Sequence, residues 1–213
     1  RWRQFPLTPE QVPIFLDHSH YVDWVQRQLQ TGAMRNERHL WTSVRPNGPS
    51  RPYDINRLEL RICDLISDPE ILIAITVLLE LRVLSLLKSP ERLDPLKVSK
   101  LTPQELAALS DKNDSAASKE SLDAILHHWR NGDPIKCRDW IKELLLEVTP
   151  LAQEMNLMNQ LAPLRLLMHE GNQAMQWLKA FAEGISVRSL VQDGVIAMKG
   201  QESLLIADEV AQE

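Results

Sequence analysis

The chain has 213 residues, of which 44% are apolar and 25% charged, and its net charge is −5. This length and composition are those of a soluble globular protein with a sizeable core, and the acidic balance argues against a general nucleic-acid binder. No apolar run reaches the roughly 18–20 residues of a membrane span, so we expect no membrane-spanning helix. The two cysteines, Cys63 and Cys137, are too few for a disulfide framework and favour a reducing, cytoplasmic compartment.

The chain starts without Met and without an apolar signal segment, so we expect it to be the C-terminal part of a longer protein. Residues 1–16 contain three prolines and are predicted to be extended. A helix is predicted over Asp17–Gln30, because apolar side chains recur at helical spacing from Tyr21 to Leu29 and Gly32 follows.

Two short strands are predicted on either side of a loop of turn residues. The first is His39–Arg45, which would place His39, Trp41, Ser43 and Arg45 on one side. The second is Asn56–Asp64, which alternates strictly and carries Arg57, Glu59 and Arg61 on one face. Its apolar face is expected to pack against helices. The Pro- and Gly-rich loop favours a hairpin, in which antiparallel pairing would set Arg45 and Ser43 beside Arg57 and Glu59.

The rest of the chain is predicted to be helical. Asp68-Pro69 is typical of a helix start, and the helix to Leu87 is apolar nearly all round, so we expect it to be buried centrally. A linker is predicted at Ser89–Lys100, and the stretch from Gly200 is expected to fray. Further helices are predicted over Pro103–Ser110, Ser118–Trp129, Lys136–Met155, Pro163–Glu183 and Ser186–Asp193. The fold class is therefore α+β, with a partial antiparallel sheet in residues 1–66 and a large helical layer in residues 67–213.

The Arg57-Glu59-Arg61 row has two interpretations. All ten cations before Lys88 are arginines, and six of them lie between Arg35 and Arg61 against three carboxylates. The row is either a surface salt-bridge ladder or a site in which a carboxylate binds Mg²⁺ and guanidiniums hold phosphate oxygens. The sequence contains no Gly-x-x-x-x-Gly-Lys phosphate loop, no G-x-G-x-x-G, no H-E-x-x-H and no G-x-S-x-G motif.

Two stretches at the predicted hairpin carry a family resemblance. The segments H-L-W-T-S-V-R-P-N-G and R-P-Y-D-I-N-R-L-E-L-R-I-C-D, followed by the D-P helix, resemble the glutamate–cysteine ligases of the cyanobacterial type. Asn113–Ala124 and Gly171–Leu178 are also similar to that family. These enzymes are carboxylate–amine ligases with a glutamine synthetase-like fold. The resemblance implies that residues 1–213 are the C-terminal part of a single catalytic domain of this kind.

The resemblance implies a reaction and roles for five residues. ATP would phosphorylate the γ-carboxylate of glutamate, and the amine of cysteine would attack the acyl phosphate, which is the first step of glutathione biosynthesis. Glu59 falls on a Mg²⁺ ligand and Arg61 on a phosphate-stabilising residue. Arg45 falls on a residue that contacts the nucleotide or acyl phosphate. Arg57 and His39 match motif positions that we assign to cofactor binding. The partners implied are glutamate, cysteine and ATP, with no nucleic acid and no membrane, and the oligomeric state is not implied.

Alternatives remain open at this stage. The amine acceptor could differ from cysteine, or the protein could be a non-catalytic helical module with an Arg-rich, anion-binding face. The family places further metal carboxylates and much of the nucleotide pocket on strands that precede this segment. We therefore expect the 213 residues by themselves not to complete their sheet or to hydrolyse ATP.

Overall fold

The computed structural model describes residues 9, 11–40, 42, 44–46, 57–61 and 66–211, with side chains to residue 203. The predicted strand positions Trp41, Ser43, Ile62 and Cys63 lie outside these residues. The chain divides into two compact units. The first comprises Arg1–Leu65 and Pro103–Ala107, and the second comprises Ile66–Thr102 and Ala108–Glu213.

The first unit is built on helix α1, His18–Gln30, as predicted. The Asp17 carboxylate caps it by accepting a 2.7 Å hydrogen bond from the His20 N–H. Its apolar side packs into a small core with the chain that follows the helix, formed by Tyr21, Val22, Trp24, Val25, Met34 and Leu40. The Leu40 carbonyl accepts a 2.6 Å hydrogen bond from Arg61, the residue after β2, so this core is tied to the hairpin.

The hairpin is shorter than its sequence pattern predicts. Strand β1, Val44–Pro46, pairs antiparallel with β2, Leu58–Leu60, and Arg45 lies opposite Glu59 as expected. The predicted strand start at His39 is wrong, because Glu37–His39 forms a 3-10 turn, η1. The Asn36 side chain caps that turn by accepting from the Arg38 N–H at 2.8 Å, a local bond that competes with extended structure.

The apolar face of β2 does not pack as predicted. Leu58 and Leu60 are 57% and 44% exposed, respectively. A two-stranded ribbon of three residues each presents both faces, and in the described residues this one is not covered. The charged face of the ribbon therefore carries the contacts that fix it.

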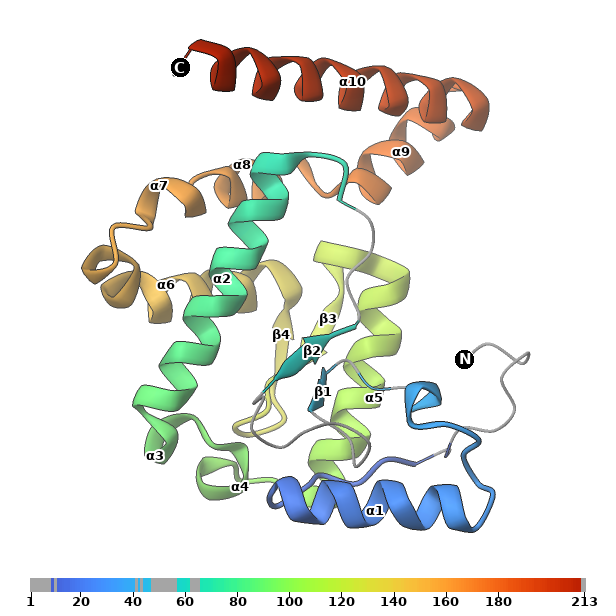
Figure 1. The fold of residues 1–213 in the computed structure, drawn as a ribbon, viewed down its shortest axis with the longest axis vertical. Coiled ribbons are helices and arrows are strands. Elements are labelled where there is room, and N and C mark those ends of the chain that lie inside the picture. Colours follow the sequence, from blue (N-terminus) through green and yellow to red (C-terminus); the bar gives the residue numbers. More distant parts are fainter. Residues whose placement is uncertain are drawn as a thin grey trace. The chain divides into compact units, whose positions relative to one another are not determined.

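The second unit packs helices around α2, Pro69–Lys88, which Asp68 caps through the N–H groups of Glu70 and Ile71. Helix α2 lies against α6 (Cys137–Glu154), α7 (Met158–Leu161) and α8 (Pro163–Glu170), as Figure 1 shows. The core they share consists of Ala74, Val77, Leu81, Val148, Leu151, Ala152, Leu161 and Leu164. The prediction of an all-round buried helix is wrong, since Ile73 and Leu87 are 52% and 73% exposed.

The predicted helix at Ser118–Trp129 is also wrong. Helix α5 runs from Pro103 to Glu120, and Ser121 ends it with a positive φ of 54°. After a short 3-10 turn, η2 (Ser121–Asp123), strands β3 (Ile125–His127) and β4 (Pro134–Lys136) form a second antiparallel hairpin. The Asn113 amide bonds both the N–H and the carbonyl of His127 at 2.8 Å, and this contact across 14 residues fixes the strand.

Other boundaries differ for local reasons. The predicted linker contains two one-turn helices, α3 (Pro90–Leu93) and α4 (Pro95–Val98), each begun by a proline. The helix predicted over Pro163–Glu183 breaks at Gly171, whose φ is 92°, and α9 (Gln173–Ala182) starts afresh with Asn172 as its cap.

The last helix, α10, spans Val187–Ala211, so the stretch from Gly200 is helical instead of frayed. Helices with two small antiparallel hairpins confirm the α+β class. Across the described residues, every helix is too short or too polar to cross a membrane.

We expect Leu81→Ala to lower the free energy of unfolding by about 2–5 kcal/mol, because Leu81 is fully buried between α2 and its neighbours. Leu87→Ala is the matched control on the same helix; Leu87 is largely exposed, and its loss should cost less than about 0.5 kcal/mol. Urea unfolding followed by circular dichroism measures both. Equal losses would contradict the burial of this helix face.

Candidate active site

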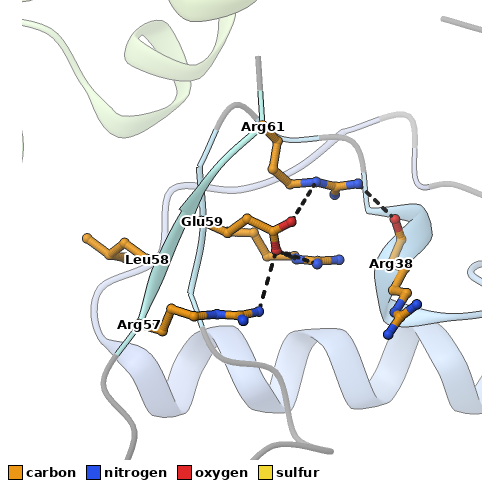
Figure 2. Close-up of a pocket in the computed structure, with 6 residues that line it drawn as sticks. Arg38, Arg57, Leu58, Glu59 and Arg61 are labelled. Atoms are coloured by element: carbon orange, nitrogen blue, oxygen red, sulfur yellow. Dashed lines mark hydrogen bonds and ion pairs between the residues drawn. The ribbon is translucent and has the colours of Figure 1, made fainter. Parts of the chain in front are cut away.

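A cavity of about 450 Å³ lies on the charged face of the first hairpin. Its lining consists of Arg38, Arg45, Arg57, Leu58, Glu59 and Arg61. Alternation along β2 projects Arg57, Glu59 and Arg61 on one side of the strand, and Figure 2 shows their side chains reaching towards Arg38 on η1. The strand register adds Arg45 from β1. Three guanidiniums thus lie within 4 Å of a single carboxylate, and Arg38 lines the same cavity.

Glu59 is the centre of this cluster. Arg45 donates to its Oε2 from Nε at 3.1 Å and from Nη2 at 2.5 Å. Arg57 lies 3.7 Å from the same oxygen, whereas Oε1 lies 3.9 Å from Nε of Arg61. The hydrogen bond from Arg45, together with the surrounding positive charge, lowers the pKa of Glu59 below its ordinary value. The carboxylate is therefore ionised at neutral pH.

Arg45 and Arg61 also hold the η1 turn. Arg45 donates from Nη1 to the Glu37 carbonyl at 3.3 Å. Arg61 donates to the Leu40 carbonyl at 2.6 Å and to the Arg38 carbonyl at 3.2 Å. The Glu37 carbonyl also accepts from the Leu40 N–H at 3.2 Å within the turn, so Arg45 adds a second donor there. Arg61 supplies donors to the Arg38 and Leu40 carbonyls. The two arginines tie η1 to the strand pair.

The charge of the cavity favours an anion. Four arginines against one glutamate leave a balance of +3. Arg57 is 42% exposed, and among the described residues its polar contact is the 3.7 Å one to Glu59. Guanidiniums of this kind bind phosphate or carboxylate oxygens in pairs. The described part of the chain holds no group of three His, Cys, Asp or Glu side chains that could bind a metal. The residues fit a phosphate-like ligand; for Mg²⁺ they offer one hard oxygen, Glu59 Oε1, beside oxygens that phosphate would bring.

The structure brings together four of the five predicted site residues: Arg45, Arg57, Glu59 and Arg61. His39 lies on η1 but does not line the cavity. The geometry agrees with both interpretations of the Arg57-Glu59-Arg61 row. The ion pairs of Glu59 fit a salt-bridge ladder, and the cavity that the row lines fits a binding site. Arg38 was missed, although it belongs to the same Arg-rich stretch; only the η1 turn reveals which way it faces.

Tyr21 was predicted only as one of the helically spaced residues of the first helix, and its charged surroundings include residues of the site. It is 2% exposed, and its hydroxyl has no hydrogen-bond partner among the described residues. Burial raises its pKa, and the charges of Arg45, Glu37, Arg61 and Glu59 all act on it. The site thus borders the core of its own unit.

Cys137, the cysteine that the structure describes, belongs to the second unit. Cys137 begins α6 as a free, half-buried thiol, and burial raises its pKa. A raised pKa leaves little thiolate at neutral pH, so Cys137 has the character of a packed side chain instead of a reactive one. Cys63 lies outside the described residues.

Comparison with known proteins identifies the family. The sequence profile of glutamate–cysteine ligase family 2 matches residues 1–197, which is most of the chain. The chain belongs to this family. A protein of Sorangium cellulosum named "Putative glutamate--cysteine ligase 2" is 26% identical over 193 residues, covering 90% of this chain and 48% of that protein. A protein of the same name from Solibacter usitatus is 26% identical over 190 residues, covering 88% and 46%. The chain therefore spans about half the length of the curated relatives it matches.

The lowered pKa of Glu59 predicts a pH-dependent contribution to stability. Its ionised form should stabilise the fold above the ordinary pKa of 4.5, and this contribution should disappear as the pH falls through the lowered value. Glu59→Gln removes it, so the melting temperatures of the two proteins should differ near neutral pH and converge as the pH falls below the lowered pKa. Glu202→Gln, an exposed change on α10, is the control. A difference between the Glu59 variant and the unaltered protein that stays constant with pH would contradict the ion pairs described.

Proposed function

We propose that this chain belongs to an ATP-dependent ligase that joins the γ-carboxylate of glutamate to the amine of cysteine, as in the first step of glutathione biosynthesis. The observation that carries the proposal is a cavity lined by four arginines, three of which pair with one ionised carboxylate. Family membership supports the ligase class, and the names of the relatives suggest the two amino acids.

The proposed reaction has two steps. An oxygen of the glutamate γ-carboxylate attacks the γ-phosphorus of ATP, the bond to ADP breaks, and an acyl phosphate forms. The cysteine nitrogen then attacks the acyl carbon, phosphate leaves with the bonding electrons, and the nitrogen loses a proton to give the amide. Both steps place negative charge on phosphoryl oxygens, which fixed positive groups stabilise most when they are already in position.

The side chains of this cavity suit those demands. Arg61 and Arg45 are the residues that we assign to charge stabilisation at the transferring phosphoryl group, and Arg57 to the nucleotide phosphates. Mg²⁺, when bound by Glu59 together with phosphate oxygens, would neutralise further charge. His39 lies outside the cavity lining, so its nucleotide contact rests on the family resemblance alone.

A second candidate function is a non-catalytic module that binds anions. It is favoured by the arginine pairs of Glu59 and by the lack of a metal cluster in the described residues. In that case Glu59 is only a counter-charge, and its removal would strengthen anion binding. The two functions therefore predict opposite consequences for one substitution.

In the full-length protein, Glu59→Gln is expected to lower Mg²⁺-dependent phosphate release by at least about 100-fold, because a charged ligand of the reacting phosphates is lost. Release is measured with ATP, glutamate and cysteine present, and Glu202→Gln serves as the control of equal charge change. Unchanged turnover combined with tighter binding of phosphate would favour the non-catalytic module.

The amine acceptor is tested separately. We expect phosphate release by the full-length protein to be fastest with cysteine when cysteine, alanine, serine and ammonia are compared at equal concentration with glutamate and ATP. The product is identified by mass spectrometry. Faster release with another amine would keep the ligase chemistry and replace cysteine as the substrate.

A further inference from the structure

We propose that Arg38 is an anion-binding residue of this cavity, carried by η1 to bind the phosphate chain of the ligand; its ligand rests on the proposed function. Neither the sequence pattern nor the family resemblance assigned it a role. Arg38 lines the cavity from the side opposite β2, and its side chain is exposed. It adds a guanidinium that comes from outside the strand pair.

The backbone of Arg38 is fixed while its side chain is uncommitted. Its N–H donates to the Asn36 side chain at 2.8 Å, and its carbonyl accepts from Arg61 at 3.2 Å. The carbonyls of Glu37 and Leu40, on either side, accept from Arg45 and Arg61. In the described structure the Arg38 guanidinium itself makes no hydrogen bond or ion pair. The fixed backbone places the free donors at the cavity, so binding a ligand would order only the Arg38 side chain.

The other guanidiniums of the cavity are less available. Arg45 is 10% exposed and uses all three side-chain nitrogens, two on Glu59 and one on the Glu37 carbonyl. Arg61 uses both terminal nitrogens on carbonyls and lies 3.9 Å from Glu59 through Nε. These contacts fix both guanidiniums in place and leave only their remaining N–H groups for an entering phosphate. Among the described lining residues, Arg57 and Arg38 are the arginines with the most donors open to it.

This arrangement divides the arginines by role. Arg45 and Arg61 hold η1 and Glu59 and, in the proposed reaction, place their charge beside the transferring phosphoryl group. Arg57 and Arg38 face the rest of the phosphate chain from two different elements. Two guanidiniums on opposite sides of a cavity bind a chain of phosphates better than a single phosphate, because each can contact a different phosphoryl group. The inferred ligand class is therefore a polyphosphate, such as the triphosphate of a nucleotide.

Arg38→Ala is the direct test, with inorganic tripolyphosphate as the probe and isothermal titration calorimetry of the purified protein as the measurement. Arg35→Ala is the matched control, since Arg35 is exposed in the same segment, carries the same charge and does not line the cavity. We expect Arg38→Ala to weaken binding by about tenfold and Arg35→Ala by less than about twofold, because a phosphate contact exceeds the loss of one distant charge. Arg38→Lys, which keeps the charge but not the fork, should fall between them.

Equal melting temperatures of the Ala variants would show that both fold alike. The inference is overturned if Arg38→Ala and Arg35→Ala weaken binding equally while Arg57→Ala weakens it tenfold; the anion site and the proposed function would then survive without Arg38. It is also overturned if the unaltered protein does not bind tripolyphosphate. A selective loss in Arg38→Ala supports it, even if the full-length protein turns over no amine, which would refute only the proposed function.

Discussion

The contact between Arg45 and Glu59 holds the first unit's functional face together. It joins β1 to β2 across the strand register, and Arg45 is nearly buried there. The same guanidinium reaches the Glu37 carbonyl, so the pair also fixes the turn that precedes the strands. Removing Glu59 would leave a nearly buried positive charge without its counter-ion, a costly state in any protein interior. The Arg45–Glu59 ion pair therefore stabilises the strand pairing and the position of η1, and it also sets the charge of the cavity.

This support explains how a ribbon of only six residues can carry a site. Its leucine face is exposed, so burial of apolar area does not define its shape. Instead Arg61 and Arg45 satisfy carbonyl oxygens of η1, and Glu59 aligns the guanidiniums against their mutual repulsion. The family to which the chain belongs supplies the ligase context, and the proposed chemistry uses the positive charge that remains after this internal pairing.

Much of this could be predicted from the sequence wherever the determinants are local. Asp17 and Asp68 are N-cap residues and mark the starts of α1 and α2. The alternation from Arg57 to Arg61 places three charged side chains on one face of β2. Distant contacts explain the misses. The bond from Asn113 to His127 converts a predicted helix into a strand, and no pattern within residues 118–129 reveals it. Arg38 faces the cavity because distant side chains bind its turn, which is equally invisible in the local sequence.

The carbonyl contacts of Arg61 have a further consequence for the protein in solution. Ions that screen guanidiniums act on ligand affinity in every phosphate site. Here the same ions would also loosen the attachment of η1, because Arg61 both adds to the positive charge of the cavity and holds the turn that carries Arg38. A rise in anion concentration would therefore change the position of η1 as well as the affinity of the site for its ligand.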